Sequence, residues 1–133
     1  MRKYLSVCML LAILLTGCGS GGRIAQADVQ MGESTIYTED EIGEAMDIVL
    51  EHFKEEFTDC YLTSLWYDEA ISVKSAEEWA VQYEAKEAIV LMSNFYTGPY
   101  GGDGSLNVNE TYENWQWILV RNDGSWELKT RGY

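Results

Sequence analysis

Residues 38–57 read TEDEIGEAMDIVLEHFKEEF, and no other stretch of the chain specifies its local structure so fully. Apolar residues recur in it every three or four positions, with acidic residues on the other side, as in an amphipathic helix that buries one face. Thr38 and Glu41 have the spacing of a capping box, in which each side chain accepts a hydrogen bond from the other residue's backbone amide. We therefore predict a helix from about Glu39 to Phe57. Its apolar face consists of Ile42, Ala45, Met46, Val49, Leu50, Phe53 and Phe57.

The rest of the chain alternates between strand and helix patterns. Ser75 and Glu78 form a second capping pair, which predicts a short helix near residues 76–84. Stretches rich in β-branched and aromatic residues predict strands, and the two longest carry apolar side chains on both faces, so both faces should be covered. The predicted strands cover residues 59–69, 87–98, 112–122 and 125–133.

These elements have to bury their apolar faces against one another. A long amphipathic helix cannot bury its stripe alone, and a curved antiparallel sheet needs a layer on its concave side. We therefore expect an α+β fold in which a curved antiparallel sheet wraps one long N-terminal helix to form a cone, with a short second helix. Residues 38–133 would form this single domain.

The first 22 residues, MRKYLSVCMLLAILLTGCGSGG, have the order of a secretory signal. Two basic residues precede an apolar run that is shorter than the roughly 20 residues a membrane-spanning helix needs. Leu15 to Cys18 resembles the bacterial lipobox, although a cysteine can also end an ordinary signal peptide by chance. We predict a signal peptide at 1–17 and lipidation of Cys18, which would anchor the protein on the extracytoplasmic face of the cell membrane.

Composition excludes some partners. The chain has 9 basic and 22 acidic residues, and loss of residues 1–17 removes two basic ones, so the charge becomes 7 − 22 = −15. That charge repels nucleic acid and anionic membrane surfaces. Most of residues 18–37 is rich in small polar residues and is expected to be a flexible tether of about 25 Å. Cys60 would be the one cysteine left besides Cys18, so no disulfide framework is expected.

Several motifs together resemble a known family: FTDCYLTSLWYDE, AIVLMSNF, GDGSLN and TYENWQWILVRNDGSWELKTRGY. They are similar to an uncharacterised family of lipoproteins from anaerobic, clostridial-type Gram-positive bacteria, within or beside the nuclear-transport-factor-two-like, cystatin-like superfamily. The resemblance covers about residues 38–133 and implies a cone-shaped fold, shallower than that of the superfamily's enzymes. It implies no chemistry, because the family has no assigned activity.

Superfamily enzymes place an acidic base inside the cone, opposite a tyrosine or a protonated acid. By that resemblance, Glu56 with Tyr61 or Tyr67 is the catalytic candidate, and helical spacing points Glu56 toward the apolar face. Alternatively, Glu56 lies at a wet helix end. We assign no catalytic residue and no cofactor, because the chain has no phosphate loop, zinc motif or nucleophile triad.

The stretch YGGDGSLNVNE, residues 100–110, places oxygen-bearing side chains on alternate positions. Asp103, Ser105, Asn107 and Asn109 have the spacing of a calcium loop, but the glycine and the final glutamate of that loop are missing. The stretch can instead be a long hairpin loop that bonds its own backbone. A third interpretation makes it the rim of a ligand site with its aromatic neighbours, Tyr96, Tyr100, Tyr112 and Trp115.

These observations favour a lipid-anchored binding or interaction module for an unidentified small molecule or protein. The candidate ligand-binding residues are Glu56, Tyr61, Tyr67, Tyr96, Tyr112 and Trp115. One alternative is a small superfamily enzyme, or its vestige, that acts on a small hydrophobic molecule. Another is a structural homodimer, joined through an apolar outer sheet face that buries Trp115 or Trp117.

Overall fold

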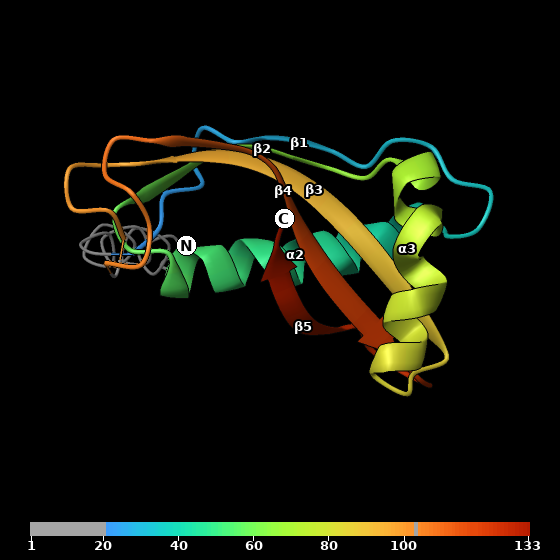
Figure 1. The fold of residues 1–133 in the computed structure, drawn as a ribbon. Helices are drawn as coiled ribbons and strands as arrows, with labels where there is room; N and C mark the ends of the chain where they lie inside the picture. Colours follow the sequence, from blue (N-terminus) through green and yellow to red (C-terminus); the bar gives the residue numbers. More distant parts are fainter. Residues whose placement is uncertain (1–20, 103) are drawn as a thin grey trace, which may run out of the picture.

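The computed structural model describes residues 21–102 and 104–133. They form an α+β structure with two helices and one mixed five-stranded sheet of order β1-β2-β3-β4-β5. Strand β1 runs parallel to β2, and the other neighbours are antiparallel. Figure 1 shows the sheet arching over α2. The elements are β1 Asp28–Gln30, α2 Glu39–Glu56, β2 Cys60–Trp66, α3 Glu69–Gln82, β3 Glu87–Thr97, β4 Thr111–Arg121 and β5 Glu127–Gly132.

Helix α2 begins and ends close to the predicted positions. The Thr38 hydroxyl accepts from the Glu41 amide at 3.1 Å, and the Glu41 carboxylate accepts from the Thr38 amide at 2.8 Å, which completes the capping box. The helix stops before Phe57, and Asp59 adopts a left-handed φ of 61° that turns the chain into β2. Its buried face comprises Ile42, Ala45, Met46, Val49 and Phe53.

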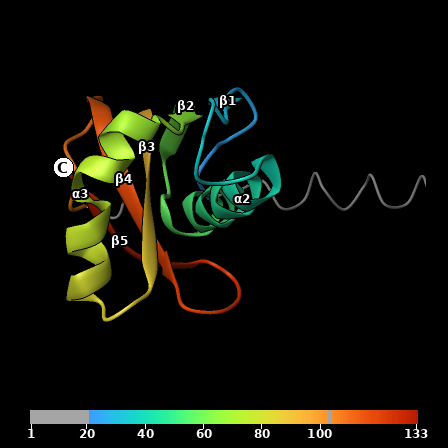
Figure 2. The same cartoon turned by 90° about the vertical axis from the view of Figure 1, so that its right-hand side faces the viewer.

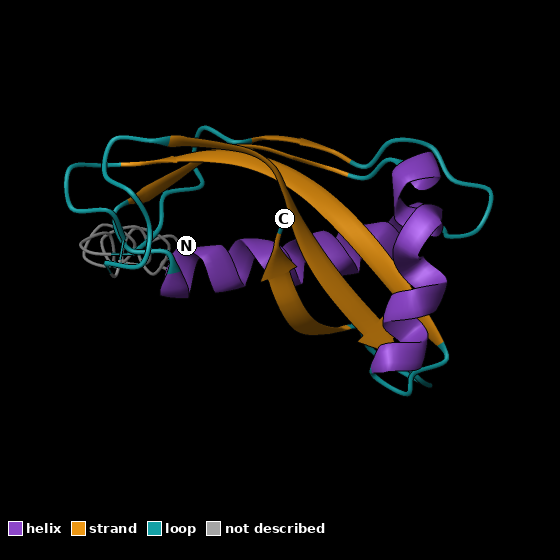
Figure 3. Cartoon of the chain, viewed as in Figure 1, coloured by secondary structure: helices purple, strands orange, loops and turns teal. Residues whose placement is uncertain are grey.

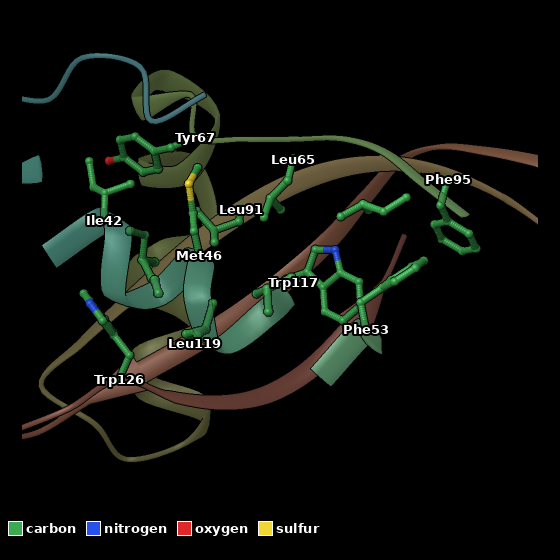
Figure 4. Close-up of a cluster of buried hydrophobic side chains, with 14 of the residues drawn as sticks. Ile42, Met46, Phe53, Leu65, Tyr67, Leu91, Phe95, Trp117, Leu119 and Trp126 are labelled. Atoms are coloured by element: carbon green, nitrogen blue, oxygen red, sulfur yellow. The ribbon is translucent and has the colours of Figure 1, made fainter. Parts of the chain in front are cut away.

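The two helices lie on opposite faces of the sheet, as Figure 2 shows. On the α2 side, Leu91, Trp117 and Leu119 of β3 and β4 pack into the main core, part of which is drawn in Figure 4. On the α3 side, a second apolar set of the same strands is covered by the helix. The prediction that both faces of these strands are covered is confirmed. This second set consists of Ala88, Val90, Met92, Ile118 and Val120.

Helix α3 begins earlier than predicted. We expected a cap at Ser75, but the N-cap is Asp68, whose carboxylate accepts from the Ile71 amide at 3.3 Å. The helix also docks through Ser72, which is buried and accepts a hydrogen bond from the Val90 amide of β3 at 3.0 Å. This long-range contact holds the first turns of the helix and left no local signature in the sequence.

The expectation of a flexible tether is wrong for residues 21–37. The Gly22 amide donates to the Lys54 carbonyl at 3.0 Å, and the chain then pairs with β2 at Arg23 and in β1. This parallel pairing also corrects the expected all-antiparallel sheet. The signal peptide at 1–17 and Cys18 lie outside the described residues. In the described part, neither helix is long and apolar enough to cross a membrane.

Candidate functional site

A pocket of about 90 Å³ lies where α2 ends. It is bounded by the last turn of the helix, the start of β2, the loop between β3 and β4, and side chains of β4 and β5. This loop, residues 98–110, is the long teal connection at one end of the molecule in Figure 3. The residues lining the pocket are Glu56, Phe57, Cys60, Gly102, Ser105, Leu106, Trp115 and Arg131.

Aromatic packing gives the pocket a fixed wall. Phe57, which follows α2, stacks on Phe53 at 4.8 Å between ring centroids and packs edge-on against Phe95 at 5.5 Å. The guanidinium carbon of Arg131 lies 5.0 Å from the centre of the Phe57 ring. Arg131 therefore places a cation against an aromatic surface that is itself locked by the core.

The loop at residues 98–110 is held by bonds to its surroundings. The backbone amides of Gly98 and Tyr100 donate to Asp59, to its carbonyl at 2.8 Å and its carboxylate at 2.7 Å. A Cβ atom at Gly98 would lie 2.3 Å from the Asp59 carboxylate, so a side chain there would displace this carboxylate. The Thr97 hydroxyl donates to the Asn107 carbonyl at 2.6 Å. These contacts agree with a loop that bonds its own and neighbouring backbone.

Trp115 contributes a buried polar atom. Its indole Nε1 is buried and has no hydrogen-bond partner among residues 21–102 and 104–133. Two positions along the same strand, the Nε1 of Trp117 donates to the Ser93 hydroxyl at 2.7 Å. Buried donors are normally paired, and an unpaired one costs about 1–3 kcal/mol. Trp115 thus lines the pocket and carries a buried donor without a partner among the described residues.

Charges of both signs surround the pocket. Glu56 is exposed at the end of α2, Arg131 is exposed at the end of β5, and both line the pocket. His52, one turn earlier, has a pKa lowered first by burial and then by the positive charge of Arg131, while Glu56 acts in the opposite direction. The His52 Nε2 is also buried without a partner among the described residues. The neutral imidazole is therefore the favoured form near neutral pH.

The opposite end of α2 holds a saturated polar cluster. The Glu69 carboxylate accepts from the Ser34 hydroxyl, the Thr35 amide at 2.9 Å and the Tyr67 hydroxyl at 2.9 Å. These hydrogen bonds, that of Ser34 first, lower the pKa of Glu69 to about 2. Burial, followed by the bond to Glu69, raises the pKa of Tyr67 to about 12. Burial, followed by the charge of Glu87, raises the pKa of Tyr37 to about 12.

Arg121 extends this cluster toward the start of α2. It forms ion pairs with Glu41 at 2.5 Å and Glu87 at 2.8 Å. Its guanidinium carbon lies 4.3 Å from the centre of the Trp126 ring, and the Trp126 Nε1 donates to the Glu41 carbonyl at 3.0 Å. Because these groups are occupied with one another, the cluster stabilises the start of the helix and leaves little capacity to bind a ligand.

The structure separates the ligand-site candidates into three places. Glu56 and Trp115 line the pocket, and Tyr112 lies beside it, stacked on Phe95 at 5.1 Å. Tyr61 and Tyr96 stack on each other at 4.8 Å. Tyr67 belongs to the saturated cluster at the other end of α2, near Ile42 in Figure 4. The catalytic group of Glu56 with Tyr61 or Tyr67 is therefore not brought together.

The calcium hypothesis concerns four residues of the loop at 98–110. Asp103, its first ligand, lies outside the described residues, while Ser105, Asn107 and Asn109 are exposed in the loop. The Asn107 amide donates to the Tyr112 hydroxyl at 2.9 Å, so part of this stretch is bound to β4. Within residues 21–102 and 104–133, no group of three His, Cys, Asp or Glu side chains could hold a metal ion. Calcium binding stays a prediction.

Arg131 was missed by the sequence analysis because strand register decides its direction. It pairs with Trp117, and side chains of paired residues share a face of the sheet. An irregularity between Ile118 and Leu119 lets Leu128 and Arg131 both face α2, although they are three positions apart. Strict alternation along β5 would have put them on opposite faces.

This chain matches no protein-family model, no curated protein and no solved structure.

Proposed function

We propose that this protein is a lipid-anchored extracytoplasmic binding module, and that it binds a small polar group in the pocket at the end of α2. The observation that carries the proposal is the buried Nε1 of Trp115, which has no hydrogen-bond partner among the described residues, on a residue that lines the pocket together with Glu56 and Arg131. A ligand acceptor that reached this donor would remove the cost of burying it unpaired.

The size of the pocket restricts what it binds. Its volume is about 90 Å³. Each water molecule occupies roughly 30 Å³ of liquid, whereas pockets for drug-sized ligands measure about 300–1,000 Å³. The pocket therefore fits the end of a larger molecule, such as a carboxylate, a phosphate or a polar side chain. An anionic end would lie between the Arg131 guanidinium and the Trp115 donor.

The finer description of the fold belongs to the same proposal. We infer a shallow cystatin-like cone and membership of the lipoprotein family whose motifs the chain resembles. The arch of five strands over α2 supports the cone, and the lipobox order around Cys18 supports the anchor and the location at the cell membrane. The short parallel strand β1 is a departure from the expected antiparallel arrangement.

No specific observation on the described residues supports either alternative function. The enzyme hypothesis needed an enclosed carboxylate opposite a tyrosine, but Glu56 is exposed and Tyr67 lies at the other end of α2. The homodimer hypothesis needed an apolar outer face, but α3 covers the apolar part of that face, and Trp117 packs on the α2 side.

The test is a titration of the mature domain with candidate ligands, monitored by two-dimensional amide NMR. The probes are phosphoglycerol, phosphoethanolamine, peptidoglycan fragments, acetate and calcium. An anionic group in the pocket should shift the amides of Phe57, Gly102, Trp115 and Arg131, and also the indole NH of Trp115.

The matched variants are Arg131→Met, which removes the pocket cation, and Lys129→Met, which removes a cation of the same strand that does not line the pocket. Binding should be lost in the first and kept in the second. If no probe shifts the pocket amides, or if Arg131→Met binds like the wild type, the proposed ligand mode is wrong. Shifts confined to Ser105, Asn107 and Asn109 with calcium would support the calcium loop instead.

A further inference from the structure

The described chain begins at the same end of the molecule as the pocket. Gly22 is bonded to Lys54 in the last turn of α2, and Arg23 pairs with Tyr61 at the start of β2. Side chains at Gly21 and Gly22 would lie 2.3 and 2.2 Å from carbonyl oxygens of α2, so the backbone fits closely against the helix. In Figure 1 the blue start of the described chain, the end of α2 and the loop at 98–110 lie together.

Cys18 is only three residues before Gly21, the first residue that the structure describes. Consecutive Cα atoms are 3.8 Å apart, so residues 18 and 21 are separated by at most about 11 Å in any conformation. The tether expected from sequence would have allowed about 25 Å. A lipid on Cys18 therefore keeps this end of the domain close to the headgroups.

We propose that this end docks on the surface of the bilayer that holds Cys18, with Tyr100, Tyr96 and Val108 as the contact. This inference rests on the lipidation that forms part of the proposed function. The partner of this surface is the interfacial layer of the membrane. In this layer, the apolar part of a side chain contacts hydrocarbon and its polar part contacts water. The pocket would then lie beside the headgroups and sample molecules at the membrane surface.

The exposed side chains at this end suit such a surface. Tyr100, Val108 and Tyr96 are 78%, 51% and 41% exposed. Tyrosine is enriched at membrane interfaces because its ring is apolar and its hydroxyl is polar. The backbone amide of Tyr100 is bound by Asp59, which fixes the base of this side chain.

A second group at this end combines rings with a cation. Tyr96 stacks on Tyr61, and the guanidinium carbon of Arg23 lies 5.5 Å from the centre of the Tyr61 ring. A guanidinium held in this way is matched to lipid phosphate. Arg23, Tyr61 and Tyr100 also line one pocket.

The net charge of the chain after loss of residues 1–17, 7 − 22 = −15, opposes contact with an anionic bilayer. Surface charges are screened over about 8 Å at physiological ionic strength, whereas two or more acyl chains anchor a protein stably. The short linker thus holds the domain against the surface in spite of its charge. The contact should be closer on zwitterionic vesicles than on anionic ones at low salt.

The test compares spin labels at the two ends of the lipidated full-length chain in vesicles. Tyr100→Cys and Val108→Cys place labels in the proposed contact, and Val81→Cys places one on α3, where the side chain is 72% exposed. Helix α3 lies at the other end of the molecule in Figure 1. Cys60 is fully buried, so it is protected from the label. Intact mass of the same sample shows whether Cys18 carries the lipid.

Labels at residues 100 and 108 should be several-fold less accessible to a water-soluble nickel chelate than the label at 81, and more accessible to oxygen. Insertion of about 20 Gly/Ser residues between Ser20 and Gly21 allows a spacing of about 25 Å and should return both labels to water. If the chain carries the lipid and all three labels are equally accessible, the docking proposal is wrong, whereas the lipid anchor is retained. A mass without lipid overturns docking and anchoring together. Labels that stay shielded after the insertion overturn the role of the short linker.

Discussion

The two ends of α2 use polar groups in different ways. At its start, Glu41, Glu69 and Arg121 are occupied by several partners each, and the pKa of Glu69 is strongly lowered. At its end, the buried nitrogens of His52 and Trp115 have no partner among the described residues, and a pocket lies beside Trp115. The first end stabilises the fold, whereas the second retains unsatisfied groups that a ligand can satisfy.

The largest difference is expected between two substitutions that delete the same atoms. Trp117→Phe removes a buried ring and its bond to Ser93, so it should lower the free energy of unfolding by about 2–3 kcal/mol. Trp115→Phe removes a donor that has no partner among the described residues, so it should change that free energy by less than about 1 kcal/mol. Urea denaturation followed by circular dichroism measures both. Equal losses would mean that the two indole NH groups are equally well paired in solution.

A smaller contrast is expected between two arginines of neighbouring strands. Arg121→Met leaves Glu41 and Glu87 without their cation, and it should cost about 2 kcal/mol, below the value for a fully buried pair because both partners are partly exposed. Arg131→Met should stay within about 0.5 kcal/mol, as for an ordinary surface position. Thermal and urea denaturation are the measurements. A large decrease in the free energy of unfolding for Arg131→Met would show that this residue stabilises the fold, which would contradict its assignment to ligand binding.

Acid should weaken the saturated end first. The pKa of Glu69 is about 2 in the folded protein and near 4.5 ordinarily, so its contribution is present above pH 4.5 and is lost as the pH falls toward 2. The urea midpoint should therefore fall through this window. Glu69→Gln should flatten the dependence. Glu77→Gln, on the same helix, is the control and should leave the slope unchanged. If the urea midpoint of Glu69→Gln falls with pH as steeply as that of the wild type, Glu69 is not the group responsible for the acid dependence.

Alkaline pH should have the smallest effect on stability, and this effect should also arise at the start of α2. The pKa values of Tyr37 and Tyr67 are about 12, compared with 10 ordinarily, so their contribution is present below pH 10 and is lost as the pH rises toward 12. Tyrosinate absorbance should show that Tyr37 and Tyr67 are among the groups that titrate late, and Tyr67→Phe should reduce the late absorbance change by one group. Tyr100→Phe, at the exposed loop, should leave both late groups in place.

Most of the secondary structure could be predicted from the sequence, because the signals are local. The capping box at Thr38 and Glu41 and the apolar period placed α2 within one residue at its end. The two-sided apolar pattern of β3 and β4 correctly required a layer on each face. Glu56 and Trp115 were nominated as ligand residues, and the structure places both at the pocket.

Tertiary structure alone decided the remaining features, because each depends on distant partners. Strand β1 exists because an edge of β2 is available for pairing, and α3 begins at Asp68 with Ser72 bonded to β3. A strand irregularity turns Arg131 toward α2. In the sequence, Trp115 and Trp117 are two tryptophans that lie two positions apart on the same predicted strand, so nothing local distinguishes them. Only the position of Ser93 across the sheet decides that the Trp117 indole is paired, whereas the Trp115 indole has no partner in the part of the chain that the structure describes.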